Sequence, residues 1–276
     1  MALIDIGINL MNRAFDAHRE AIVARAAKAG VSPLVITGAN LQSSQRALDY
    51  ARTFPQKAAL FTTAGVHPHD AKTFDNGPAG TIASLRALAS SVLVLAIGEC
   101  GLDYNRDFSP RTQQRFCFAQ QLLLAAELGL PVFLHERDAF ADFSAMLTNV
   151  QGTLKAACVH CFTGTAAQLD AYLALGCYIG ITGWVCDERR GKHLIPLLKK
   201  IPADKLLLET DAPFLLPRTM EQKDTNGRRN NEPAFLPHIA RFIAEALEKD
   251  IEQLATETFA NTLNFFPRLN QALIRA

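Results

Sequence analysis

The chain has 276 residues, of which 49% are hydrophobic and 20% charged, and its formal net charge is +1. This composition predicts an ordinary soluble globular protein with one substantial core, and the net charge alone argues neither for nor against a nucleic-acid partner. No apolar run approaches the about 20 residues of a membrane span, and no basic lead-in indicates a signal peptide. Without a composition break or internal repeat, we expect a single domain over residues 1–276 that does not contact a membrane.

Six cysteines lie mainly in or beside apolar segments, at positions 100, 117, 158, 161, 177 and 186. Free buried thiols are typical of such positions, and they indicate a reducing cytoplasm. Cys158 and Cys161 form a C-x-x-C pair, but no second pair stands at zinc-ribbon spacing. We therefore interpret them as strand residues around His160. The protein is expected to be cytoplasmic and monomeric.

Eight short apolar runs without polar alternation are predicted as strands buried on both faces. In chain order they are "ALIDIGIN", "SPLVITGAN", "ALFTTAGVHPHD", "VLVLAIGECGLD", "LPVFLHERD", "LKAACVHCFTG", "CYIGITGW" and "KLLLETDAPFLLPR". Most of these runs deliver a polar or titratable residue at the C-terminal end of the strand. One such residue is explained by a helix cap, whereas six indicate a functional site.

Helical patterns lie between the apolar runs, at Phe15–Lys28, Leu41–Thr53, Ser109–Gly129, Ala166–Leu175, Pro237–Lys249 and Ile251–Phe266. Strands that alternate with helices predict βαβ units and a parallel sheet. Eight units in a chain of this length predict an α/β fold of the (β/α)8 TIM-barrel type. A doubly wound open sheet is the alternative. No glycine-rich phosphate loop follows the first strand, which disfavours it.

Four of the strand-end residues, Glu99, His135, His160 and Asp211, have the spacing of one, one and two strand–helix units. They are therefore predicted to share the rim where barrel enzymes keep their active sites. Two carboxylates and two imidazoles around one point suit a divalent metal. Each histidine alone is more often a hydrogen-bonded core residue, but the joint placement favours a metal site.

Several stretches resemble the TatD family of metal-dependent deoxyribonucleases, and they occur in the same order over nearly the whole chain. They are "AGVHPHD", "AIGECGLDY", "PVFLHERD", "VHCFTG", "YIGITGWVCDERRG", "LLLETDAPFLLPR" and "RRNNEPAFLPHI". The resemblance implies a barrel of the metal-dependent hydrolase type, with Glu99, His135, His160 and Asp211 as metal ligands. It also implies 3′→5′ exonuclease action on single-stranded DNA and RNA, with a role in clearing damaged DNA.

The chain departs from most of that family at the end of the first strand, where Gly7 and Asn9 replace an H-x-H motif. Asp5 is interpreted as a buried hydrogen-bonding carboxylate rather than a ligand, whereas Asn9 could offer its carbonyl oxygen or orient a water. Compared with a site that keeps both histidines of that motif, this site has two imidazoles fewer and is richer in oxygen ligands and water. That favours Mg²⁺ over Zn²⁺, with Mn²⁺ as the other hard ion.

The predicted chemistry is hydrolysis of a phosphodiester, with Glu99 and Asp211 as the catalytic carboxylates and Asp211 as the general base. Substrate contacts are expected from three kinds of side chain. His67, His69, Arg137 and Arg229 would meet phosphate oxygens, and Phe162 and Trp184 would stack on bases. Each of these residues also fits a structural role, either in a polar loop braced by Pro68 or in packing.

Two other functions remain open on the sequence alone. The same fold and ligands could serve a metal-dependent ester or amide hydrolase, for example one acting on an aminoacyl-tRNA linkage, because function lies in the loops. The chain could also be a nucleic-acid-binding protein without catalysis. A change of Glu99 to alanine would abolish turnover in either enzyme and leave a pure binder's affinity largely intact.

Overall fold

We describe the fold from a computed structural model that covers residues 1–56, 59–220 and 230–275. Its strands follow the predicted apolar runs: β1 Leu3–Ile8, β2 Val31–Ile36, β3 Leu60–Ala64, β4 Val94–Asp103, β5 Val132–Arg137, β6 Ala157–Val159, β7 Tyr178–Ile181 and β8 Leu206–Leu208. They form one eight-stranded sheet in the order of the chain. The pairs β1–β2, β3–β4, β4–β5, β5–β6 and β7–β8 are parallel, and β1 also contacts β8. The predicted (β/α)8 class is confirmed.

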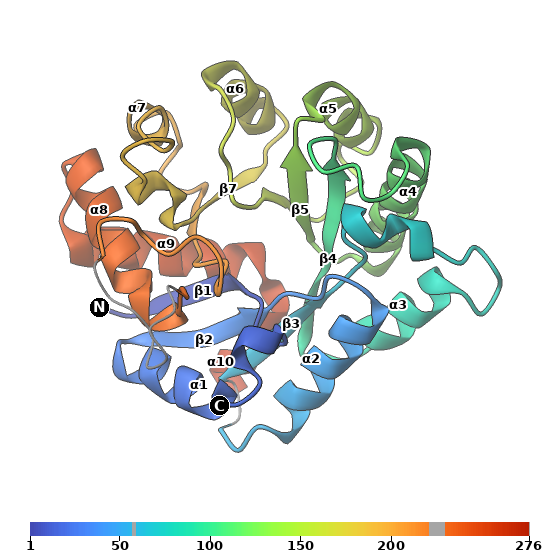
Figure 1. Cartoon of the computed structure of the whole chain (residues 1–276), viewed down its shortest axis with the longest axis horizontal. Coiled ribbons are helices and arrows are strands. Elements are labelled where there is room, and N and C mark those ends of the chain that lie inside the picture. The colour runs from blue at the N-terminus through green and yellow to red at the C-terminus, as the bar shows by residue number, and fades with distance from the viewer. Residues whose placement is uncertain (57–58, 221–229, 276) are drawn as a thin grey trace. The chain divides into compact units, whose positions relative to one another are not determined.

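Helices alternate with the strands along the chain, as the colour ramp of Figure 1 shows. The α-helices are α1 Arg19–Lys28, α2 Leu41–Thr53, α3 Thr81–Ala89, α4 Arg111–Leu128, α5 Phe140–Asn149, α6 Ala166–Ala174, α7 Leu194–Leu198, α8 Leu236–Leu247, α9 Ile251–Phe265 and α10 Pro267–Arg275. Short 3-10 helices are η1 Arg13–Phe15, η2 Pro68–Thr73, η3 Gly183–Cys186 and η4 Pro233–Phe235.

Local sequence signals set several helix ends. Asn40 caps α2 through a reciprocal pair of hydrogen bonds with Ser43, and Gly129 ends α4 in the left-handed conformation that glycine tolerates best. The predicted start at Phe15 is wrong, because Asn12 caps the separate turn η1 and α1 begins only at Arg19.

The described residues form two compact units. The first contains residues 1–36, 161–169 and 179–264, and the second contains residues 37–160, 170–178 and 265–276. In the first unit, β7 and β8 pair with Ile181 opposite Leu208. In the second, β3 to β6 pair in sequence. The single domain expected from the sequence stays a prediction.

Each unit buries the apolar side chains of its strands. All ten residues of β4 are buried, and so are the three leucines of β8. The six cysteines are free, and all but Cys161 are buried, which confirms the expected thiols. Among the described helices, none combines the length and apolar character needed to cross a membrane.

Candidate metal centre

Glu99 lies at an irregularity of β4. In the pairing of β4 with β5, Gly98 is opposite Phe133 and Cys100 is opposite Leu134, so that Glu99 is the extra residue of a β-bulge. Bulges re-aim a side chain and are common beside active sites. The glycine before Glu99 is required, because Gly98 has φ +140° and a Cβ there would collide with the Phe133 carbonyl.

Three imidazoles converge on one carboxylate oxygen, Oε1 of Glu99. His160 Nε2 lies 2.8 Å from it, His135 Nδ1 3.0 Å and His67 Nε2 3.3 Å. The Glu99 side chain is 8% exposed and that of His160 is 4% exposed. The structure therefore brings together three of the four predicted ligands and adds His67, which was predicted only as a phosphate contact.

A second carboxylate, Asp103, stands behind the histidines. Its Oδ2 lies 2.7 Å from His69 Nε2 and 3.5 Å from His135 Nε2, while its Oδ1 accepts from the backbone N–H groups of Asn105 and Arg106. The Asp103 side chain is only 1% exposed. Asp103 thus anchors His69 through a hydrogen bond and places its carboxylate beside the His135 ring.

The protonation equilibria follow from this packing. Burial lowers the pKa of His67 to about 4, against the pull of Glu99, so His67 is neutral near pH 7. Burial would also raise the pKa of Glu99, but His160 and His67 and the hydrogen bonds with His135 hold it well below its usual value. Burial alone would lower the pKa of His135, yet the neighbouring carboxylates of Asp103 and Glu99 raise it.

The arrangement fits a metal ion. His67, Glu99 and His135 each offer one ligand atom, and these atoms lie within 4.8 Å of one another. His135 Nε2 is buried and forms no hydrogen bond with any group in the described part of the chain. Its separation of 3.5 Å from Asp103 exceeds a normal hydrogen bond. Imidazole nitrogens oriented by a carboxylate behind them are typical of metal sites.

The other unit holds the fourth predicted ligand, Asp211, which follows β8 with φ +54°. Asn9 Nδ2 donates to Asp211 Oδ1 at 2.8 Å, and Asp211 N donates to the Gly7 carbonyl at 2.9 Å. Asn9 therefore orients the carboxylate of Asp211. Asp5 is fully buried and accepts hydrogen bonds from the backbone of Gly7 and from both the backbone and the hydroxyl of Thr210.

The residues predicted to contact the substrate differ in how far their side chains are exposed. Arg137 is exposed at the end of β5, and the His69 side chain is 33% exposed against the ring of Phe108. Phe162 is only 5% exposed, so packing leaves it little ring surface for a base, and the structure does not favour that prediction. Arg229 lies outside the described residues.

Trp184 lies in η3 with one face covered. The guanidinium of Arg190 stacks 4.3 Å from its ring centroid and also bonds Asp187. A base stacking on Trp184 would have to displace Arg190 or use the opposite face of the ring.

Sequence reasoning missed the role of Asp103. Its signal was present in "GECGLD", where Asp103 ends the same apolar run four residues after Glu99. Its place at the C-terminal end of that run is the signal that could have assigned Asp103 to the same site, because strand spacing alone is interrupted by the bulge at Glu99.

Buried parallel strands in (β/α)8 order, with carboxylates and imidazoles at their C-terminal ends, define the class of barrel hydrolases. Within it, the chain belongs to the family of TatD-related DNases, whose model matches residues 4–267.

Relatives of similar length support this assignment. The chain is 51% identical over 264 residues to a protein of Erwinia amylovora named 3′-5′ ssDNA/RNA exonuclease TatD, with 96% of this chain and 99% of that one covered. A protein of the same name from Pectobacterium parmentieri is 51% identical over 265 residues, with the same coverage. Among solved structures, the TatD homologue YjjV of Escherichia coli K12 is 26% identical with a TM-score of 0.85, over 96% of this chain and 98% of that one.

Proposed function

We propose that this protein is a metal-dependent phosphodiesterase that degrades single-stranded DNA and RNA from the 3′ end. The observation that carries the proposal is the convergence of the His67, His135 and His160 rings on Oε1 of Glu99, in a chain of the TatD-related DNase family. Relatives that are 51% identical over nearly their whole length are named as 3′-5′ exonucleases for these substrates.

The proposed ion is Mg²⁺, held by Glu99, His135 and His160. The group around Glu99 is richer in imidazole than the sequence predicted, because His67 also points at it. Imidazole nitrogen suits Zn²⁺, whereas carboxylate and water oxygen suit Mg²⁺ and Mn²⁺. With His67 donating to a phosphate oxygen, the ion would have one carboxylate, two imidazoles and positions for water, which suits Mg²⁺. Restoration of activity to the metal-stripped protein by Zn²⁺, but not by Mg²⁺ or Mn²⁺, would overturn the choice of Mg²⁺.

When bound, the ion would supply Lewis-acid polarisation of the phosphate and a more acidic water. The side chains of the chain do the rest. His67 Nδ1 accepts from the backbone N–H of His69, so the neutral His67 ring carries its proton on Nε2. Asp103 bonds the ring of His69 and lies beside that of His135. His69, whose side chain is 33% exposed, is proposed as a further contact for phosphate. Asp211, oriented by Asn9, is proposed as the base that takes a proton from the attacking water.

The cellular setting is part of the same proposal. Free cysteines support a reducing cytoplasm. The proposal includes a role in the turnover of damaged DNA, which the family resemblance implies, and a monomeric state, which size-exclusion chromatography with light scattering would test.

The experiment that tests the proposed function compares two substrates with one preparation. A labelled single-stranded oligonucleotide should be shortened from its 3′ end, whereas p-nitrophenyl acetate should be left intact. Rapid hydrolysis of the ester with an intact oligonucleotide would instead identify an ester hydrolase. Binding of the oligonucleotide without any hydrolysis would identify a nucleic-acid-binding protein.

A further inference from the structure

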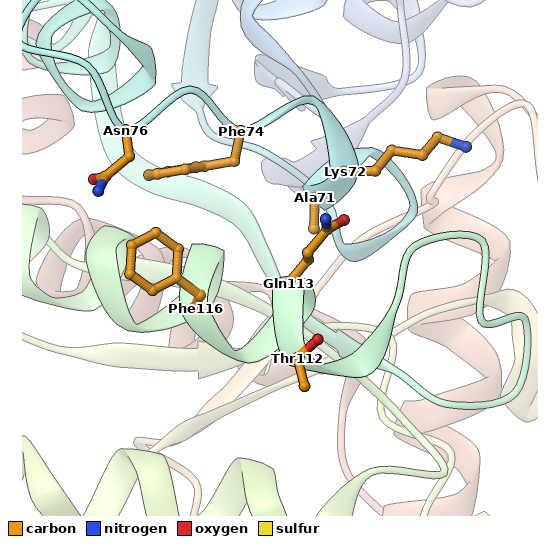
Figure 2. Close-up of a pocket in the computed structure, with 7 residues that line it drawn as sticks. All are labelled: Ala71, Lys72, Phe74, Asn76, Thr112, Gln113 and Phe116. Carbon is orange, nitrogen blue, oxygen red and sulfur yellow. The ribbon is translucent and has the colours of Figure 1, made fainter.

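A pocket of about 220 Å³ opens beside the metal centre, on the same unit of the chain. It lies between η2 with the segment that follows it and the first turns of α4. Figure 2 shows Phe74 and Asn76 facing Phe116 across it. The lining residues are Ala71, Lys72, Phe74, Asn76, Thr112, Gln113 and Phe116. None of them belongs to the group around Glu99, so the pocket has no role in the chemistry described above.

Hydrogen bonds and a ring contact join the residues around this pocket to the segment that carries His67 and His69. His67 caps the start of η2, and the ring of His69 packs against Phe108 with 4.8 Å between centroids. Ser109 Oγ donates to the His69 carbonyl at 2.8 Å and accepts from Lys72 N at 3.0 Å. The 3-10 helix η2 therefore connects His69, a proposed phosphate contact, directly to Ala71 and Lys72, which line the pocket.

The chemistry of the lining suits a nucleobase. The rings of Phe74 and Phe116 pack edge to face, 5.5 Å apart at 89°, and Phe116 is 44% exposed. Aromatic faces that stay open to solvent are the stacking platforms of single-strand binders. The amides of Asn76 and Gln113 can bond the edge of a base. Lys72, whose Nζ donates to the Phe108 carbonyl at 3.2 Å, lies on the side toward His69, where a phosphate would pass.

The size of the pocket argues for a small occupant. Sites for drug-sized ligands enclose about 300–1,000 Å³, and this pocket is smaller. A single planar ring fits it better than a helix or an extended peptide does, and the polar rim of amides and a hydroxyl matches the polar edge of a base.

We propose that this pocket holds one nucleobase of the single-stranded substrate, a fixed number of nucleotides from the phosphodiester that is hydrolysed. The inference rests on the proposed nuclease function and adds a specificity site to it. The bound base sets the register of the strand and makes substrates long enough to reach the pocket bind more tightly than shorter ones. Because bases in a duplex are paired and stacked, the pocket also selects single strands.

The test measures binding separately from turnover. Affinity is measured by fluorescence anisotropy in a Glu99→Gln background, with single-stranded oligonucleotides of increasing length and with one abasic nucleotide moved along the strand. Phe116→Ala is the test variant, and Leu123→Ala is the matched control, since Leu123 is 57% exposed on the same helix but does not line the pocket. Phe116→Trp keeps an aromatic face.

Phe116→Ala should weaken binding of the longer strands about tenfold, within the range of about 5- to 150-fold for loss of one stacked base. Leu123→Ala should leave it unchanged, and Phe116→Trp should restore most of it. In the protein with Phe116 intact, an abasic nucleotide at one position of the strand should cause the same loss of affinity. In Phe116→Ala, the same abasic nucleotide should cause no further loss. The proposal is overturned if Phe116→Ala behaves like Leu123→Ala, or if its effect does not depend on the position of the missing base.

Turnover by the protein with Glu99 intact judges the proposed function independently. If the oligonucleotide is hydrolysed but Phe116→Ala has no effect, the nuclease function is supported and the base pocket is overturned. If binding depends on the position of the missing base but no hydrolysis occurs, the base pocket is supported and the nuclease function is overturned. If the oligonucleotide does not bind, the base-pocket proposal is overturned, whether or not hydrolysis is observed.

Discussion

Asp103 and Glu99 hold opposite edges of the same imidazole. The Oδ2 atom of Asp103 lies 3.5 Å from Nε2 of His135, and Nδ1 of that ring lies 3.0 Å from Glu99 Oε1. The buried Asp103 thus places a negative charge beside the edge of the His135 ring that faces away from Glu99.

Replacing Asp103 by asparagine should lower metal affinity or activity about 10- to 100-fold, as loss of a carboxylate behind a metal-binding histidine usually does. The side chain keeps its size but loses its charge, so His135 and His69 lose their anchor. Metal titration of the phosphodiesterase activity measures the effect. Asp142→Asn is the control, since Asp142 pairs with Arg115 on the surface. Equal behaviour of the two variants would remove Asp103 from the site.

Replacing Glu99 by glutamine should reduce turnover at least about 100-fold, because a bound cation supplies several kcal/mol of transition-state stabilisation. Oligonucleotide binding should persist, since the phosphate and base contacts remain. The exposed Glu127, paired with Arg86, provides the matched control Glu127→Gln. Turnover by Glu99→Gln at the unaltered rate would show that the ion is held elsewhere.

Asp5 should make folding stability depend on pH. Burial raises its pKa to about 7. Because an ordinary aspartate titrates near 4, the folded state binds the extra proton between about pH 4 and 7. The stability that protonated Asp5 contributes to the folded state is therefore fully present below about pH 4. It is lost as the pH rises to about 7, at up to about 1.4 kcal/mol per pH unit.

The neutral His67 acts in the opposite sense, since burial lowers its pKa to about 4. Urea unfolding of Asp5→Asn and of the unaltered chain at several pH values isolates the contribution of Asp5, because His67 is common to both. Asp5→Asn should gain stability relative to the unaltered chain as the pH rises from 4 to 7. A difference that does not change with pH would mean that Asp5 is ionised in the folded protein.

Single strands should be degraded at least tenfold faster than the same strand in a blunt duplex. The phosphate must reach side chains that are 4–20% exposed, and a duplex end has to fray before it can do so. Fraying costs about 1.4 kcal/mol per stacked step, which is about tenfold in rate. Gel assays in low salt with magnesium measure the ratio, and unpaired 3′ overhangs should narrow it. Equal rates would contradict the enclosed site.

All eight strands were predictable because each is a short apolar run that must be buried. The run Leu206–Leu208 coincides with β8. Helices were harder. Those after β3, β5 and β7, and the last helix α10, were not singled out. None of the first three ends at a glycine, as α4 does at Gly129. The wrong start at Phe15 arose because alanine-rich spacing does not show that Asn12 begins a separate turn.

The site was predictable in its residue types but not in its contacts. Strand ends pointed to Glu99, His135 and His160, since parallel strands present their C-terminal ends on one side. The convergence of His67 on Glu99 depends on the bulge in β4, which changes the register by one residue and leaves no mark that a single sequence reveals. The pocket at Phe116 likewise requires two segments to be placed side by side.

The most direct test of the central claim is the 3′→5′ shortening of a 5′-labelled single-stranded oligonucleotide by chelator-treated protein before and after addition of Mg²⁺. The account predicts no shortening without metal and a ladder that recedes from the 3′ end once Mg²⁺ is added. It also predicts that neither Glu99→Gln nor added Zn²⁺ reproduces that ladder. Unchanged shortening by the metal-stripped protein, or by Glu99→Gln with Mg²⁺, would contradict the assignment of this group as the metal centre of a nuclease.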